Sequence, residues 1–251
     1  MTKRVRVEDT SGLRRITLDR PEKINALDRG MMEAVAAAVR DAPTPDTRLI
    51  VLTGAGERGF CAGADVAELT AGEAALRLQI SALEAVAAAF ANSRTPIVAL
   101  LHGRTLGAGG LIACLSTLVL AAETATIGFP EIHFGLYPMM VYAALLERVP
   151  SALAFQLCAS GRVLSANQAQ ALGIVTEVLP TETFAAAAEE RLHFFSERAE
   201  GLMLGRQAAR LAADLPLIPR MAALRPLLLD NYAQPFVRDL ILALARPRPP
   251  R

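Results

Sequence analysis

Apolar and polar positions alternate along the first residues of the chain and then change to a helical spacing. Residues 5–10 and 14–20 alternate in period two on either side of the turn "TSG", which predicts a β-hairpin. Residues 25–42 carry apolar side chains at helical spacing before two prolines, which predicts one helix that ends there. Residues 48–54 are mostly apolar, as expected for a strand buried on both faces.

The middle of the chain alternates helical patterns with short apolar runs. Residues 71–93 predict a long helix, and residues 96–103 predict a second buried strand. Another helix is predicted to begin within the glycine-rich segment 103–110 and to end near Ser116. Residues 117–132 then predict a strand, a turn and a short strand. This order of elements indicates an α/β fold.

The last part of the chain reads as helices. Residues 137–188 predict short helices with loops, and from residue 185 the pattern is only helical, with proline breaks at "LPLIPR" and "LRPLL". We therefore expect a body over residues 1–190 and a helical region over residues 191–251. The basic, proline-rich residues 245–251 are expected to be a solvated end.

Composition excludes several classes of protein. A net charge of +1 argues against a nucleic-acid partner, because phosphate binding needs a concentrated basic face. The three cysteines are odd in number and lie far apart, which favours a reducing compartment, here the cytoplasm, and no structural metal. The charged N-terminus predicts no secretory signal. Residues 105–122 carry no charge, but the glycines and two different patterns within them favour a buried helix and strand over a membrane span.

Two glycine-rich segments need separate explanations. Gly54, Gly56 and Gly59 have the spacing of a dinucleotide fingerprint, but no helix follows directly and no suitable acidic residue ends a second strand. Segment 103–110 lacks the G-K-[ST] ending of a nucleotide P-loop. Each segment follows a buried strand and leads, directly or after a further loop, into a helix. Free backbone N–H groups from both segments can therefore converge on one carbonyl oxygen as an oxyanion hole. The alternative is that the glycines only permit tight turns.

Taken together, these segments resemble the crotonase family, the enoyl-CoA hydratase/isomerase superfamily. The resemblance lies in "TLDRPEKINALD" (17–28), "GERGFCAGADVAEL" (56–69), "VALLHGRTLGAGG" (98–110), "ATIGFPEIHFGLYP" (125–138) and, more loosely, residues 159–180. It implies a spiral of ββα units with C-terminal helices that mediate trimer packing, and hence a homotrimer or a hexamer. It also implies an acyl-CoA thioester substrate and no separate cofactor, because coenzyme A is part of the substrate.

The resemblance also implies roles for particular residues. It assigns the two oxyanion N–H groups to Ala64 and Ala108 and an acid–base carboxylate to Glu131. Further residues are expected along the bound substrate: Lys23, Ala26, Ala62, Asp65, Val66, Ala67 and Gly109. Chemically, a thioester carbonyl held by two N–H donors can carry the negative charge of an enolate, and a nearby carboxylate can remove or return the α-proton.

The sequence departs from the family at two places in this site. Leu111 stands where hydratases of the family have a first catalytic glutamate, and leucine cannot move a proton. Met139, Met140 and Tyr142 stand where many members have glycines, so they would narrow the acyl pocket; the alternative is a helix packing its apolar face.

Other polar side chains are expected to be structural or exposed. Glu123 is expected in an exposed turn, whereas Asp65 and Glu68 are expected to cap or solvate the helix after the first glycine turn. No catalytic role is assigned to any histidine, namely His102, His133 and His193. The C-terminal segment lacks the family's basic pattern, which weakens any contact between an arginine there and a coenzyme A phosphate.

A single carboxylate favours double-bond isomerisation slightly over hydration. One group can remove a proton at one carbon and return it at another, whereas hydration also needs an activated water. Three alternatives stay open: hydration by Glu131 alone, another CoA-thioester reaction such as decarboxylation or hydrolysis, and a non-catalytic acyl-CoA-binding protein.

Overall fold

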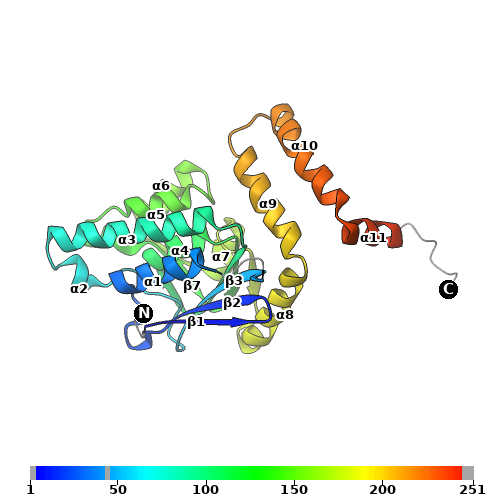
Figure 1. The fold of residues 1–251 in the computed structure, drawn as a ribbon. Helices are drawn as coiled ribbons and strands as arrows, with labels where there is room; N and C mark the ends of the chain where they lie inside the picture. Colours follow the sequence, from blue (N-terminus) through cyan, green and yellow to red (C-terminus); the bar gives the residue numbers. More distant parts are fainter. Residues whose placement is uncertain (1–3, 43–45, 245–251) are drawn as a thin grey trace. The chain divides into compact units, whose positions relative to one another are not determined.

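The computed structural model describes residues 4–42 and 46–244. Their contacts form two compact units, one ending at Glu197 and the other beginning at Arg198 (Figure 1). Residue 190, where we expected the boundary, lies inside helix α8 (Phe184–Glu197). Residues 245–251, expected to be a solvated end, lie outside the described residues.

A six-stranded sheet forms the centre of the first unit (Figure 1). Its strands, in spatial order, are β1 (Val5–Thr10), β2 (Leu13–Leu18), β3 (Leu49–Gly54), β4 (Ile97–Leu101), β6 (Leu118–Ala122) and β9 (Glu177–Leu179). The β1–β2 hairpin is antiparallel and every other pair is parallel, which confirms the predicted hairpin. β4 is buried along its whole length, as are the first four residues of β3, which explains their continuous apolar runs.

A second, smaller sheet contains the predicted short strand within residues 117–132 and two strands that the sequence pattern did not reveal. It is formed by β5 (Arg104–Leu106), β7 (Thr126–Gly128) and β8 (Val163–Ser165). Residues 137–188 were predicted to be helices and loops, so β8 and β9 correct that prediction. Each is three residues long, too short to show an alternating pattern, and is defined only by pairing with a strand distant in sequence.

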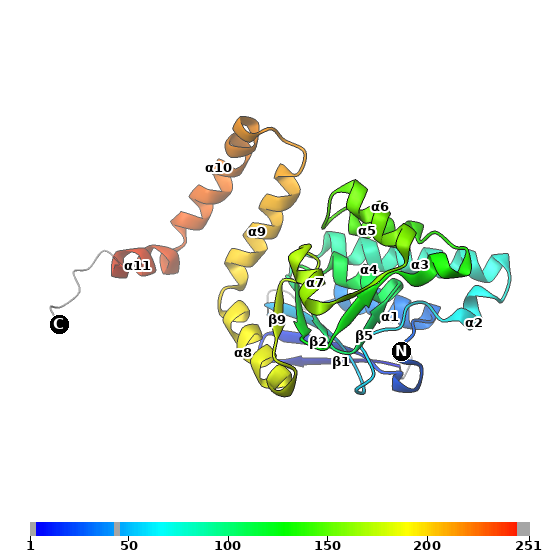
Figure 2. The same ribbon diagram turned by 180° about the vertical axis from the view of Figure 1, so that it is seen from behind.

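Most helices of the first unit lie on one side of the sheets (Figure 2). The α-helices of this unit are α1 (Arg29–Arg40), α2 (Val66–Leu69), α3 (Glu73–Asn92), α4 (Ala108–Leu115), α5 (Met139–Leu145), α6 (Ser151–Ser160), α7 (Ala166–Ala171) and α8. Asp28 starts α1, because its carboxylate accepts a hydrogen bond of 2.8 Å from the Met31 N–H. The buried face of α1 includes Met32 and Val35, and this helix packs against α3.

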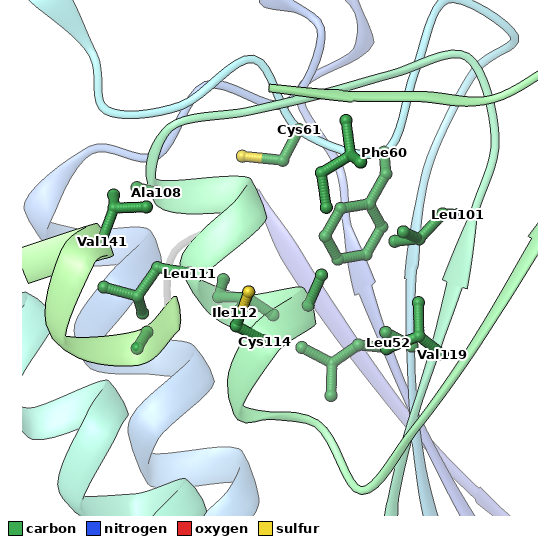
Figure 3. Close-up of a cluster of buried hydrophobic side chains, with 14 of the residues drawn as sticks. Leu52, Phe60, Cys61, Leu101, Ala108, Leu111, Ile112, Cys114, Val119 and Val141 are labelled. Carbon is green, nitrogen blue, oxygen red and sulfur yellow. The ribbon is translucent and has the colours of Figure 1, made fainter. Parts of the chain in front are cut away.

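Helix α4 begins inside the glycine-rich segment and ends at Leu115, as predicted. Leu111 extends from α4 toward α5, where Val141 lies, whereas Phe60 and Leu101 lie toward the main sheet (Figure 3). The other end of α4 is held by Arg148, whose Nε donates to the Cys114 carbonyl at 2.7 Å. The uncharged stretch 105–122 is therefore divided between α4 and the strands on either side of it.

Among the described residues, α3 is the one helix long and apolar enough to cross a membrane by length and composition. Core helices of globular proteins pass the same test. Val86 and Phe90 of α3 are buried within the protein core, on a helix that packs against α1. Helix α3 therefore packs one face into the protein core.

The second unit consists of α9 (Ala199–Ala212), α10 (Leu217–Ala233) and α11 (Pro235–Leu244), a succession of helices as predicted. The expected break at "LPLIPR" is confirmed between α9 and α10. The break expected at "LRPLL" is wrong, because Pro226 lies inside α10. Proline removes one backbone donor from a helix, but the turns on both sides of Pro226 remain helical and α10 packs against its two neighbours.

Candidate active site

Two unused backbone N–H groups belong to two segments that pack together, segment 61–65 and the start of α4. Ala108 is the first residue of α4, and Gly107 before it has a φ of 50°. Gly63 packs against this turn, so that a Cβ placed on Gly63 would lie 3.8 Å from the Ala108 nitrogen. Among the described residues, neither the Ala64 N–H nor the Ala108 N–H has a hydrogen-bond acceptor. Two such donors, one at a helix N-terminus, have the chemistry that an oxyanion hole requires.

The carboxylate of Glu131 lies over the same turn. The short helix η2 (Pro130–Phe134) carries Glu131, and a Cβ on Gly107 would lie only 2.5 Å from its Oε1. A side chain at Gly107 would therefore displace the carboxylate. The other oxygen, Oε2, is buried and has no hydrogen-bond partner among the residues that the structure describes.

Burial raises the pKa of Glu131, against a smaller lowering by its own backbone N–H. A carboxylate that is harder to ionise is a better proton acceptor once charged, and it gains protons closer to neutral pH. Glu131 therefore has the properties of a group that both removes and returns protons.

Leu111 occupies the first turn of α4 beside these groups. Its N–H donates to the Gly107 carbonyl at 3.0 Å, and its side chain is only 2% exposed. The side chain lies near Ala108 and Val141 in Figure 3. This part of the site is therefore lined with hydrocarbon.

Backbone hydrogen bonds join the segment 20–28 to the segment 61–65. The Ala62 N–H donates to the Ile24 carbonyl, the Leu27 N–H to the Gly63 carbonyl and the Asp65 N–H to the Leu27 carbonyl, each at 2.8 Å. These bonds bring together residues that the sequence analysis placed along the substrate: Lys23, Ala26, Ala62, Ala64 and Asp65. The Lys23 side chain is exposed, as are Val66 and Ala67 at the start of α2.

A buried ion pair that sequence analysis missed holds these two segments. The Arg20 guanidinium is almost fully buried and donates to Asp65 Oδ2 at 2.6 Å and to the Ala26 carbonyl at 3.2 Å. Asp65 also accepts from the Ala67 N–H at 3.1 Å, which confirms that it caps α2. The Lys23 ammonium lies 3.3 Å from Asp65 Oδ2. Arg20 lies within the segment that resembles the family, but its burial becomes visible only in the fold.

The Asp65 carboxylate is held in its charged form. Burial on its own raises the pKa of Asp65, but the hydrogen bonds from Arg20, the Ala67 N–H and Lys23 outweigh burial and leave this pKa lowered. The hydrogen-bonding capacity of the Asp65 side chain is thus taken up within the protein. The segment around Asp65 presents its backbone and small side chains to the solvent.

The other predicted substrate-lining residues are divided among different environments. Met140 and Tyr142 are half-buried against the core, whereas Met139 is exposed at the start of α5. Gly109 is buried, and a Cβ there would lie 2.7 Å from the Cys61 Cβ. Gly109 therefore allows α4 to approach segment 61–65 closely.

Two polar side chains near Glu131 were also missed by sequence analysis. The Tyr137 ring packs against the rings of Tyr142 and Phe155, with centroids 5.9 and 5.8 Å away. Cys158 on α6 is fully buried beside the Tyr137 hydroxyl. Burial raises the pKa of Cys158 to about 11, with a further contribution from the charge of Glu131, so the thiol keeps its proton.

The histidines lie outside this group. His102 Nε2 is 2.8 Å from the Gly56 carbonyl oxygen, His193 Nε2 is 3.3 Å from a Glu197 carboxylate oxygen, and His133 is exposed. Within residues 4–42 and 46–244, no cluster of three His, Cys, Asp or Glu side chains has the arrangement of a metal site.

The geometry of two donors and a carboxylate can be compared with known proteins. The family model described as enoyl-CoA hydratase/isomerase matches residues 13–245. The chain belongs to this family. A probable enoyl-CoA hydratase, echA8 of Mycobacterium bovis, is 34% identical over 176 residues, which cover 66% of this chain and 65% of that protein.

Family relatives with other names match as well. Enoyl-CoA delta isomerase 2 of Rattus norvegicus is 29% identical over 201 residues, 78% of this chain and 51% of that protein. The mitochondrial 3-hydroxyisobutyryl-CoA hydrolase of Mus musculus is 31% identical over 190 residues, 74% of this chain and 49% of that protein. The chain thus spans about two thirds of the first relative and about half of the other two.

Solved structures of the family share the fold over nearly the whole chain. An enoyl-CoA hydratase from Thermoplasma volcanium has a TM-score of 0.86 at 29% identity, covering 98% of both chains. An enoyl-CoA hydratase from Mycobacterium smegmatis has a TM-score of 0.89 at 23% identity, covering 98% of this chain and 99% of the other. The expected crotonase-type α/β fold with C-terminal helices is confirmed.

Proposed function

We propose that this chain is an acyl-CoA enzyme that moves a carbon–carbon double bond by way of a thioester enolate. The observation that supports this proposal is the packing of Gly63, which precedes the free Ala64 N–H, against the turn that carries the free Ala108 N–H and lies under the Glu131 carboxylate. Oxyanion donors and a proton-transferring group are the two parts that enolate chemistry needs.

The reaction begins with a 3-enoyl thioester whose carbonyl oxygen accepts from Ala64 and Ala108. Glu131 removes a proton from the carbon next to the carbonyl, and the electron pair moves into the carbonyl to give a dienolate. The two N–H groups stabilise the oxygen anion; loss of one such donor typically costs about 3–4 kcal/mol of transition-state stabilisation. Glu131 then returns the proton two carbons further along, which gives the 2-enoyl thioester. No water is consumed.

The joined segments 20–28 and 61–67 are proposed to bind the coenzyme A part of the substrate. Their surface offers the Lys23 ammonium, the half-buried Ala26 and the exposed residues Val66 and Ala67. Contacts remote from the reacting carbons position the thioester for proton transfer. In the same proposal, Met140 and Tyr142 limit the size of the acyl group.

Isomerisation is preferred to hydration because Leu111 supplies neither a proton nor a hydrogen bond to water. Hydration with Glu131 alone, decarboxylation and thioester hydrolysis are competing reactions that the same enolate site supports chemically. A chain that binds acyl-CoA without turnover is the competing function of a different class.

Assembly is proposed to be a trimer or a dimer of trimers, in the cytoplasm. Helix α10 carries large exposed apolar side chains, a surface typical of an interface between protein chains. They are Leu217, Ile218, Met221, Leu228, Leu229 and Tyr232. Sedimentation of the purified protein measures this assembly directly.

The test uses panels of 2-enoyl- and 3-enoyl-CoA thioesters. Double-bond absorbance and product mass are followed for the unaltered protein and for Glu131→Gln. We expect conversion of 3-enoyl to 2-enoyl thioesters without a gain of 18 mass units for water, and near-complete loss in the variant. Turnover that is unaffected in Glu131→Gln would refute the role of Glu131. Tight CoA binding without turnover would favour the binding protein instead.

A further inference from the structure

Two buried polar atoms in the region of Glu131 lack hydrogen-bond partners among the described residues. They are Glu131 Oε2 and the Tyr137 hydroxyl oxygen. Buried polar atoms in folded proteins are nearly always hydrogen-bonded, and an unsatisfied atom costs stability. Such atoms at a substrate site therefore indicate where a ligand supplies the partner.

The two atoms belong to one place in the fold. Tyr137 follows η2, and the Leu136 N–H next to it donates to the Glu131 carbonyl at 3.2 Å. Helix α6 packs against η2 and carries Cys158, which adjoins both the Tyr137 hydroxyl and the charge of Glu131. The Cys158 thiol interacts with the Tyr137 hydroxyl, but it is a weak hydrogen-bonding group and forms no hydrogen bond of normal geometry with either oxygen.

The ring of Tyr137 is fixed, which gives its hydroxyl a defined position. Tyr142 and Phe155 contact it from α5 and α6. Burial raises the pKa of Tyr137, as do the neighbouring Cys158 and Tyr142, so the hydroxyl is protonated at neutral pH and acts as a donor. The ionised Glu131 carboxylate, in contrast, only accepts.

We propose that the Tyr137 hydroxyl and Glu131 Oε2 bind one hydroxyl-type oxygen between them, so that Tyr137 is a further substrate-contacting residue of this site. An oxygen in that position accepts from Tyr137 and donates to Glu131. A water molecule and a hydroxyl group on the acyl chain both satisfy that requirement, whereas a carbonyl oxygen cannot donate to the carboxylate.

This inference rests on the proposed use of Glu131 in acyl-CoA chemistry. It also bears on the choice of reaction, because Tyr137 provides a polar contact that Leu111 does not. If the bound oxygen is water, the site holds water for addition to a 2-enoyl thioester. If it is an acyl hydroxyl, the site selects 3-hydroxyacyl thioesters.

The test compares Tyr137→Phe, which keeps the ring and removes the hydroxyl, with Ser81→Ala, which removes an exposed hydroxyl from α3. Titration calorimetry measures binding of butyryl-CoA and of 3-hydroxybutyryl-CoA. Absorbance assays measure water addition to crotonyl-CoA and isomerisation of a 3-enoyl-CoA, with KM and kcat determined separately.

An acyl hydroxyl predicts that Tyr137→Phe weakens binding of 3-hydroxybutyryl-CoA about 3- to 12-fold and leaves butyryl-CoA binding unchanged. Bound water predicts instead a similar or larger fall in kcat for water addition, with isomerisation unchanged. Either result supports the proposal, and Ser81→Ala is expected to match the unaltered protein.

The proposal is overturned if Tyr137→Phe matches Ser81→Ala in every assay, or if it weakens binding of both thioesters equally, as a packing defect would. In both cases the proposed function survives, provided that Glu131→Gln loses activity. Absence of any CoA-thioester binding by the unaltered protein would overturn the proposed function and this inference together.

Discussion

The two halves of the site differ in how they satisfy their polar groups. In the half formed by segments 20–28 and 61–67, the buried Asp65 carboxylate is paired with Arg20 and Lys23. Backbone hydrogen bonds of 2.8 Å join these two segments. In the half formed by Glu131, Tyr137 and Cys158, two buried oxygens have no partner among the described residues. The first half is completed by the protein, and the second is left for a ligand to complete.

This difference has a physical consequence for each half. A fully hydrogen-bonded network keeps the surface of the first half rigid. A rigid surface suits the proposed binding of coenzyme A, the part of the substrate that is the same for every acyl group. A carboxylate with a raised pKa and an open hydrogen-bonding position retains the freedom to exchange protons and ligand atoms. Changes in the first half should therefore affect stability most, and changes in the second should affect turnover most.

The largest effect is expected for Glu131→Gln. Loss of the proton-transferring group should lower kcat about 10²–10⁴-fold, which steady-state assays with a 3-enoyl-CoA will measure. The same variant should be more stable than the unaltered protein at neutral pH. The pKa of Glu131 is raised in the folded state, so the protonated side chain is compatible with the fold and the ionised one destabilises it. The fold therefore loses stability as pH rises through the raised pKa of Glu131, and glutamine, which stays neutral, avoids this loss.

Denaturant unfolding at several pH values checks the sign of this effect. The stability gain of Glu131→Gln should be present at pH 7 and absent below the ordinary glutamate pKa of 4.5. A variant that is less stable at pH 7 would contradict the assignment of Glu131 to the open half of the site.

Arg20→Met removes the buried ion pair in the half formed by segments 20–28 and 61–67. Removing Arg20 leaves the buried Asp65 with only the exposed Lys23 and backbone donors, which should lower the free energy of unfolding by about 3–5 kcal/mol. The lowered pKa of Asp65 stabilises the fold above the ordinary aspartate pKa of 3.8, and that contribution is lost as pH falls. The variant should therefore lose less stability than the unaltered protein as pH falls below 3.8.

Arg77→Met provides the matched control, because Arg77 and Glu73 form an ion pair of 2.6 Å that is exposed on α3. Its effect on the free energy of unfolding should be below about 1 kcal/mol. Equal effects of the two substitutions would remove the distinction between a buried, site-forming pair and a surface pair.

Gly107→Ala should disturb both halves at their junction. Its Cβ would meet Glu131 Oε1, and a φ of 50° is unfavourable for alanine. We expect about a 10- to 100-fold loss of kcat/KM with a folded protein, since a small misplacement of a catalytic group has effects of that size. Gly72→Ala has a similarly unfavourable φ of 103° in open space, so it should lose stability but keep its activity.

Leu111→Glu is the mildest test of turnover, and it asks whether the open half can be converted to a two-carboxylate site. A second acid–base group should raise water addition to 2-enoyl-CoA by up to about 10²-fold, the lower end of such effects. Burial of the new carboxylate should cost about 2–4 kcal/mol of stability, measured by denaturant unfolding. Leu111→Gln carries the same shape without the charge, and a gain of hydration in this control would contradict the explanation.

The main elements of the fold follow from local sequence. The β1–β2 hairpin, α1, α3 and α4 were predicted because each has a full period of apolar residues and a recognisable turn or cap. The strands β5, β8 and β9 were missed because three residues carry no period. The helix break predicted at Pro226 was wrong because the rule considers only the proline itself. The helical turns before and after Pro226 in α10 continue despite the lost backbone donor.

The sequence by itself determined the family, the glycine turns at Gly63 and Gly107, and the absence of a carboxylate at Leu111, because those features lie in contiguous motifs. Only the tertiary structure decided that Arg20 is buried against Asp65 and that Tyr137 and Glu131 leave oxygens without partners. Burial and hydrogen bonding depend on segments that are distant in sequence, such as 20–28 with 61–65 and η2 with α6. The motifs thus specify which groups are present, and the packing of distant segments determines which of them remain available to a substrate.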